Sequence, residues 1–217
     1  MDKVLNFLGE LAENNNREWF HDNKPRYDEC RQKVLFLTEV LINELGEFDT
    51  QIRGLQAKDC MYRIFRDVRF SKDKRPYKTN FGSFICKGGR RSVNPGYYFH
   101  IEPGGSFIGG GIFKPQSEQL RAIRNYLTEH GDEFMELTSS PDFKREFPEM
   151  YDDKLKTAPK GFPKDHALIA LLRYKSFIFS KSFADSTVTG DRFVEKIVAG
   201  FETLQPVNSF LYEALAE

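Results

Sequence analysis

YRIFRDVRFSKDKRPYKTNFGSF, residues Tyr62 to Phe84, is the stretch of the chain that most strongly predicts a sheet. Its aromatic and β-branched residues occur at the density that is typical of strands. We therefore predict a strand from about Cys60 to Phe70, a loop from Ser71 to Lys78 and a return strand from Thr79 to Cys86. Pro76 would set the path of the loop.

The same stretch carries a local excess of positive charge. Its cations, opposed only by Asp67 and Asp73, are Arg63, Arg66, Arg69, Lys72, Lys74, Arg75 and Lys78. The whole chain has 32 Lys and Arg residues and 32 Asp and Glu residues, so the excess is confined to this place. It predicts a bound anion nearby, which Arg would hold bidentately and Lys as a mobile point charge.

An ion-paired, solvated sheet face is the alternative interpretation of these charges, because exposed pairs of this kind contribute little to stability. It is strongest for the cations of the loop tip, residues 72–75. It is weaker for Arg66, Asp67 and Arg69, which lie among apolar neighbours.

The remainder of the chain predicts strands in the middle and helices on both sides. Helices are expected at about Asp2–Ala12, Pro25–Gly46, Gln116–His130, Asp132–Leu137, 167–172, Asp191–Leu204 and Pro206–Ala216. Two further helices are expected to begin at Arg17, after an N-cap at Asn16, and at Pro141. Further strands are expected at Gly96–Glu102, Ser106–Phe113 and about Tyr174–Ser180. This order predicts a single α+β domain over residues 1–217, with a mainly antiparallel sheet of four or five strands flanked by N- and C-terminal helices.

The strand Gly96–Glu102 supplies one wall of a candidate site. Alternation along it places Tyr98, His100 and Glu102 on one face. Among the four histidines of the chain, His100 is the best placed general base, although a histidine on a strand can also be purely structural. We expect Asp67 to be buried beside this face, and the glycines Gly109–Gly111 to leave open volume there.

The candidate residues fall into two groups. The predicted catalytic residues are Asp67, His100 and Glu102. The predicted anion-binding residues, which would line the same concave site, are Arg66, Arg69, Lys72, Asp73, Lys78 and Tyr98.

A divalent metal ion is a further alternative for this site. Asp67, Asp73, His100 and Glu102 have the oxygen and imidazole groups that can hold such an ion beside a phosphate. None of their spacings is diagnostic of a metal, however. The sequence therefore assigns no metal ligand and leaves the cofactor open.

Four stretches of the chain resemble a known family. They are RIFRDVRFSKDKRPYKTNFGSF, NNNREWFHDNKPRY at Asn14–Tyr27, YYFHIEPGGSFIGGGIFKP at Tyr97–Pro115, and APKGF with Asp165-His166 downstream. Together they resemble the domain of unknown function 2461 family of conserved hypothetical proteins. The resemblance covers most of the chain and implies one full-length domain, but it implies no activity, substrate or cofactor.

The sequence predicts a cytoplasmic protein. Its three cysteines are an odd number without metal-like spacing, the N-terminus lacks the features of a signal peptide, and no apolar stretch approaches the length of a membrane span. The sequence leaves the oligomeric state open.

We expect a basic anion-binding site in an enzyme that acts on a phosphorylated or nucleotide-like substrate. No nucleophile motif stands out, so the reaction is not assigned. The alternative is a non-catalytic module that binds nucleic acid or an acidic partner protein through cations interleaved with aromatic residues. An enzyme needs these charges in a concavity, whereas a binding module needs them on an exposed face.

Overall fold

The computed structural model describes residues 1–216, and its strands form an antiparallel sheet. Within those residues the sheet has four strands in the order β1-β2-β3-β4, which are Phe81–Ile85, Gly96–Ile101, Phe107–Ile112 and Phe177–Ser182. Short turns join the first three strands, so neighbours in the chain pair as neighbours in the sheet. The predicted α+β class and the predicted strands after residue 79 are confirmed.

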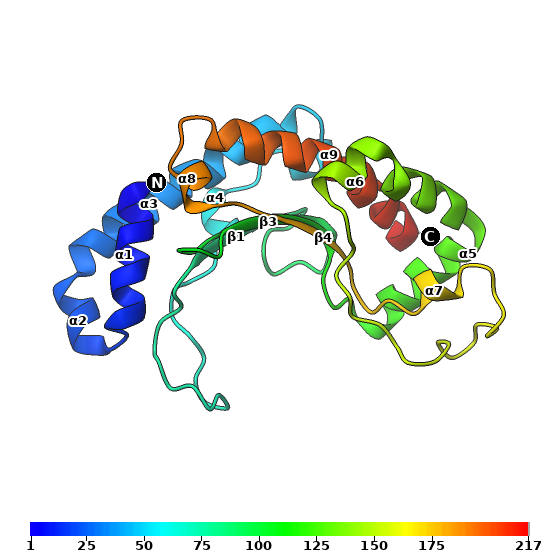
Figure 1. The fold of residues 1–217 in the computed structure, drawn as a ribbon, viewed down its shortest axis with the longest axis horizontal. Coiled ribbons are helices and arrows are strands. Elements are labelled where there is room, and N and C mark those ends of the chain that lie inside the picture. The colour runs from blue at the N-terminus through cyan, green and yellow to red at the C-terminus, as the bar shows by residue number, and fades with distance from the viewer. Residues whose placement is uncertain (217) are drawn as a thin grey trace.

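Helices precede the sheet, follow it and interrupt it before the last strand (Figure 1). They are α1 Asp2–Glu13, α2 Arg17–Asp22, α3 Lys24–Gly46, the 3-10 helix Thr50–Ile52, α4 Ala57–Cys60, α5 Ser117–Ser139, α6 Pro141–Glu146, α7 Ile169–Leu172, α8 Asp185–Val188 and α9 Phe193–Ala216. The N-cap predicted at Asn16 is confirmed, because its side chain accepts a hydrogen bond from the Trp19 N–H.

One face of the sheet is covered by helices. Tyr97, Phe99 and Ile101 alternate along β2 and are all buried, and the ring centroid of Tyr97 lies 5.2 Å from that of Phe201 in α9. Figure 1 shows α9 running over the sheet on this side. The side chains between these residues, at positions 98 and 100, therefore lie on the opposite face, which we call the open face.

The predicted strand at Cys60–Phe70 is wrong. Residues 57–60 form α4, and beyond it Met61 and Phe65 make only isolated bridges. Strand propensity reflects packing on a half-buried surface. Phe70 has no such surface, since it is 96% exposed.

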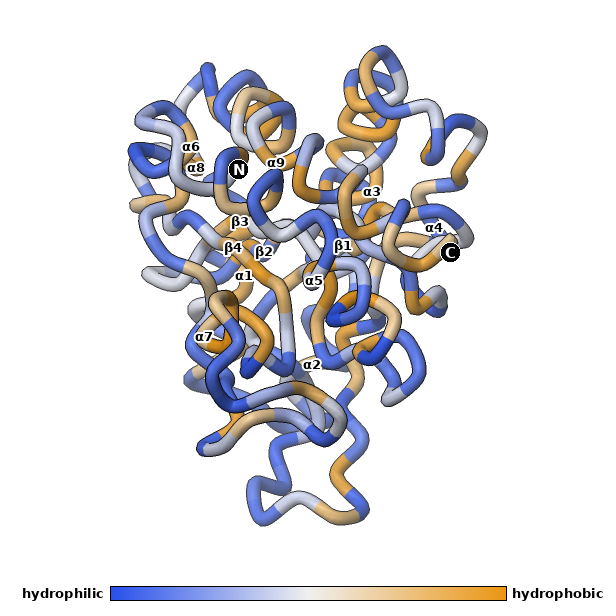
Figure 2. The backbone as a smooth tube through the Cα atoms, turned by 90° about the vertical axis from the view of Figure 1, so that its right-hand side faces the viewer, coloured by the Kyte–Doolittle hydropathy of each residue, from blue (hydrophilic) through white to orange (hydrophobic). Residues whose placement is uncertain are grey.

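Residues 62–80 instead form a projecting segment, which we call the arm. It is the lowest part of the molecule in Figures 1 and 2, and most of it is hydrophilic. Its base is fixed to the turn between α1 and α2, where the Asn15 side chain donates to the carbonyl of Tyr77 at 3.0 Å and accepts from its N–H at 3.1 Å. Phe20 stacks on the Tyr77 ring with centroids 4.0 Å apart. The arm is therefore anchored at its base and exposed at its tip, residues 66–75.

One predicted helix break is present as a kink, and the other is wrong. Two helical segments meet within α5 at His130, whose φ of −117° and ψ of 16° are not helical, one residue before the predicted break at Gly131. The helix α9, by contrast, continues through Pro206. A proline removes one helical hydrogen bond, but α9 keeps its conformation because buried residues on both sides of the proline, Phe201 and Phe210 among them, pack into the core.

The glycines of β3 serve close packing of strands rather than open volume. Gly111 has φ +113°, which side chains rarely adopt, and an added Cβ would collide with the carbonyl oxygen of Phe177 in β4. The close backbone approach that the sequence predicted at Gly109–Gly111 is thus present. The expectation that these glycines leave room for a ligand is not supported by their surroundings.

Candidate acid–base site on the open face

A chain of hydrogen bonds runs along the open face of β2. The Tyr98 hydroxyl lies 3.0 Å from His100 Nδ1, and His100 Nε2 lies 3.0 Å from Glu102 Oε2. The other carboxyl oxygen of Glu102 accepts a hydrogen bond of 2.5 Å from the Thr79 hydroxyl at the end of the arm. We call these four side chains the relay. The predicted face of Tyr98, His100 and Glu102 is confirmed.

The neighbours of His100 define its tautomer. An ionised Glu102 can only accept, so His100 Nε2 carries a hydrogen that it donates to the carboxylate. In the neutral ring, Nδ1 then has a lone pair and accepts the Tyr98 hydroxyl proton. The carboxylate is placed to stabilise the cation that forms if the imidazole accepts a proton.

Packing holds the two rings in this geometry. Phe107, opposite His100 in β3, stacks on the imidazole with centroids 4.8 Å apart. On the other side Gly82 lies opposite His100 in β1, and a Cβ there would collide with the Tyr98 hydroxyl. The missing side chain at Gly82 thus lets the phenol lie close to β1 and reach His100.

Burial shapes the acidity of the relay. The pKa of Tyr98 is raised above the ordinary tyrosine range mainly by desolvation, with smaller contributions from Tyr62 and Glu102. Tyr98 therefore remains a protonated donor at neutral pH. The His100 side chain keeps 12% of its surface exposed and Glu102 keeps 32%, so solvent reaches the relay.

Lys78 lies at the edge of this site. Its Nζ is 5.2 Å from the ring centroid of Tyr62, whose ring meets Tyr98 edge-on at 6.3 Å. Desolvation, followed by the nearby charge of Arg63, lowers the pKa of Lys78. Among residues 1–216 the ammonium has neither a carboxylate nor a hydrogen-bond acceptor, so it is a half-buried cation without a counterion.

The remaining predicted anion-binding residues outside the relay lie in the arm tip, and all but Lys72 are ion-paired there. Arg66 Nη1 lies 2.6 Å from Asp73 Oδ2, and Arg75 Nη2 lies 2.7 Å from the same oxygen. Lys72 is exposed and has no partner within the part of the chain that the structure describes. Arg66 and Asp73 therefore satisfy each other within the arm, and no contact joins these described side chains to His100.

The prediction that Asp67 is buried is wrong. Its side chain is 46% exposed and binds Arg69, with 2.6 Å between Oδ2 and Nη2. This pair keeps the pKa of Asp67 below its ordinary value. Because the strand that was expected to carry Asp67 and Arg69 onto the sheet does not form, both side chains lie in the arm tip instead.

The metal alternative lacks a converging ligand set. Among the described residues, no three His, Cys, Asp or Glu side chains lie close enough together to hold a metal ion. Asp67 and Asp73 pair with arginines in the arm tip, whereas His100 and Glu102 are hydrogen-bonded to each other on the sheet.

Two members of the site were not singled out from the sequence. The Thr79 hydroxyl donates a hydrogen bond to Glu102, and the absence of a side chain at Gly82 leaves room for the Tyr98 hydroxyl. If the antiparallel register that pairs Phe81 with Ile101 had been predicted, it would have placed Thr79 and Gly82 beside β2. The return strand was predicted from Thr79, but its register against β2 was not.

The fold and the open face define an α+β protein with a Tyr–His–Glu relay on the uncovered side of an antiparallel sheet. The chain belongs to the DUF2461 family, described as conserved hypothetical protein, whose model matches residues 3–210. No curated protein and no solved structure matched the chain in the corresponding comparisons. Among the described residues no helix is both long enough and apolar enough to span a membrane.

Proposed function

We propose that this protein is a cytoplasmic enzyme that performs acid–base chemistry on a phosphorylated or nucleotide-like substrate at the open face. The observation that carries the proposal is the continuous hydrogen bonding of Tyr98, His100, Glu102 and Thr79. A histidine between a hydroxyl and a carboxylate is a general base with an oriented ring.

Each residue has a distinct role in this proposal. His100 accepts a proton from a substrate hydroxyl that takes the place of the phenol, and Glu102 stabilises the resulting imidazolium. Lys78 binds the phosphate of the substrate, because an unpaired and half-buried ammonium gains a counterion in doing so. Arg66 and Arg69 take no direct part, because they pair with Asp73 and Asp67 in the arm tip.

The cytoplasmic part of the proposal rests on the thiols. Cys30, Cys60 and Cys86 are free and buried. Burial raises the pKa of Cys60 to about 11 and of Cys86 to about 12, and so keeps both in the unreactive thiol form.

A thermal-shift screen tests the anion site. Nucleotides, phosphorylated sugars and pyrophosphate are added at low salt to the wild type, to Lys78→Met and to Lys72→Met. We expect a ligand at 100-fold its Kd to stabilise the wild type by about 2.7 kcal/mol. Lys78→Met should weaken binding about tenfold or more, because it removes a charge-assisted hydrogen bond.

The matched control is Lys72→Met, which removes an exposed cation of the arm tip. This variant should bind nearly as the wild type does. Flat melting curves across the panel would contradict the proposal.

Turnover of any ligand found in this screen tests the relay itself. His100→Gln keeps a polar side chain but removes the base, and we expect the rate to fall about 10²- to 10⁴-fold. Unchanged turnover in this variant would remove His100 from the chemistry.

A second candidate function is a non-catalytic module that binds nucleic acid or an acidic partner through the arm. The observation that favours it is Phe70, which is 96% exposed beside Arg69, whose guanidinium lies 5.9 Å from the ring centroid. Such binding should weaken steeply with salt and be unaffected by His100→Gln.

A further inference from the structure

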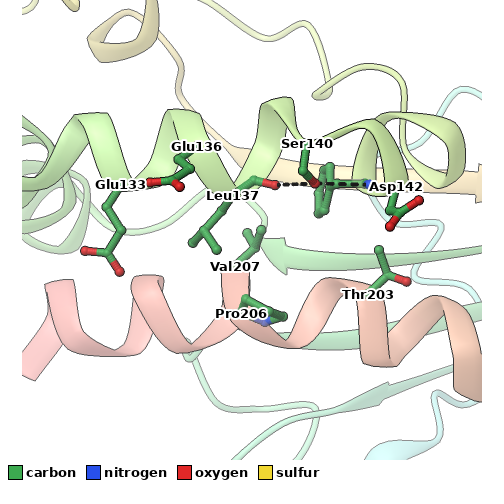
Figure 3. Close-up of a pocket in the computed structure, with 9 residues that line it drawn as sticks. Glu133, Glu136, Leu137, Ser140, Asp142, Thr203, Pro206 and Val207 are labelled. Carbon is green, nitrogen blue, oxygen red and sulfur yellow. Dashed lines mark hydrogen bonds between the residues drawn. The ribbon is translucent and has the colours of Figure 1, made fainter.

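A surface groove of about 450 Å³ lies between α5, α6 and α9, on the helical side of the molecule. Figure 3 shows that Leu137 of α5 and Val207 of α9 point toward one another across it. Phe143 and Pro206 complete its apolar lining. Pro206 is exposed here, so the proline that interrupts the hydrogen bonding of α9 faces this groove.

Carboxylates stand around the apolar lining. Glu133 and Glu136 border the groove from α5, and Asp142 borders it from α6. Asp142 pairs with Arg145 at 2.9 Å. Glu133 and Glu136 are exposed and have no cationic partner among residues 1–216. An occupant that is apolar at its centre and positively charged around it would therefore complement the groove.

The arm tip has that chemistry. Phe70 is the most exposed of the large hydrophobic residues. Nearby, Lys72 lacks a partner, and Lys74 Nζ donates only to the carbonyl of Val68 at 3.0 Å. Over residues 66–75 five cations stand against two carboxylates. An exposed aromatic residue with cations beside it is a typical anchor of a protein interface.

We propose that the groove binds the arm tip of a second copy of this chain, with Phe70 on the apolar lining and Lys72 and Lys74 beside Glu133 and Glu136. The arm projects from the open side of the sheet, whereas α5, α6 and α9 lie on the covered side (Figure 1). The contact therefore joins two molecules. Because the chain has 32 residues of each charge, net charge does not oppose their association.

The symmetry of such a contact follows from its two different surfaces. A head-to-tail interface leaves one arm and one groove free in each dimer, so it adds further copies or closes into a ring. With one aromatic anchor the contact is small, and we expect a Kd on the order of 100 µM.

Sedimentation velocity of the full chain over a range of concentrations tests the proposal. The wild type should show a sedimentation coefficient that rises with concentration and falls back in high salt. Phe70→Ser removes the anchor, and the double variant Glu133→Lys with Glu136→Lys reverses the charge around the groove. Each variant alone should remain monomeric. Mixed together they should form dimers and nothing larger, because the first retains a groove and the second an arm.

Controls separate this proposal from loss of folding and from the proposed catalytic site. Phe36→Ser, at a residue of α3 that is 68% exposed, should associate as the wild type does, and so should His100→Gln. Circular dichroism melting curves should show that all variants are folded. A wild type that stays monomeric at every concentration, or a Phe70→Ser variant that associates normally, overturns the proposal. The wild type could instead bind single-stranded oligonucleotide and not self-associate, with the oligonucleotide binding lost in Phe70→Ser. That result would assign the arm tip to nucleic acid and would also overturn the proposal.

Discussion

The relay on the open face and the arm tip are both rich in polar side chains, but they differ in how those side chains are held. Each relay side chain is fixed by a partner from another part of the fold: Phe107 stacks on His100, and Thr79 reaches Glu102. In the arm tip the charged residues bind near neighbours in the sequence, as Asp67 binds Arg69. Charge density in a sequence therefore does not show which charges are available to a ligand.

The two regions also differ in how much of their side-chain surface is exposed to solvent. His100 is mostly buried, whereas Phe70 at the arm tip is almost fully exposed. A relay of this kind suits chemistry, which needs fixed geometry. An exposed tip suits encounter with another molecule, and the two regions can be altered independently because they share no described hydrogen bond.

The largest expected effect contrasts two phenylalanines. Phe99 is buried under the relay in β2, and Phe99→Ala should lower the free energy of unfolding by about 3–5 kcal/mol through lost burial and a cavity. Phe70→Ala should change it by about 0.5 kcal/mol or less, since the ring is already in solvent. Urea denaturation of both variants measures the contrast. Equal losses would show that the arm tip is packed rather than exposed.

An intermediate effect is expected at Gly82. An added methyl group in Gly82→Ala would collide with the Tyr98 hydroxyl, so the phenol must move away from His100. We expect a loss of about 1–3 kcal/mol of stability from overpacking. The double variant with Tyr98→Phe, which lacks the hydroxyl, should be less affected than the sum of the two single changes. Strict additivity in this cycle would show that Gly82 does not position Tyr98.

The smallest effect is a pH dependence of the arm tip. Hydrogen bonds from the Arg75 side chain, the Arg75 N–H and Arg66 hold the pKa of Asp73 well below its ordinary value. Since the unfolded value is about 3.9, this carboxylate stabilises the fold above that pH and loses its contribution as the pH falls toward the lower folded value.

The comparison of wild type with Asp73→Asn measures this dependence. Their difference in stability should be constant above about pH 5 and shrink below about pH 4. High salt should reduce it, because the pairs are exposed to solvent. A difference that grows with acid would contradict the assignment.

The boundaries that the sequence predicted well are those set by local signals. The cap at Asn16 and the alternation of β2 required only neighbouring residues. Gly131 is a local signal of the same kind, because α5 kinks at the adjacent His130. Pro206 is also a strong local signal, but the packing of α9 overrides it. Propensity is a weak guide wherever many buried contacts hold a helix in place.

By itself the sequence determined the α+β class and the shared face of Tyr98, His100 and Glu102, because hydrophobic periodicity and alternation are local properties of the chain. It also determined the family, through the motifs that the family model matches over residues 3–210. Only the tertiary structure decided that Thr79 and Gly82 complete the relay, since strand register joins residues about 20 positions apart. It also decided that residues 66–75 leave the sheet. Whether a stretch of strand-forming residues becomes a strand depends on a surface for it to pack on, and the fold provides none at Phe70.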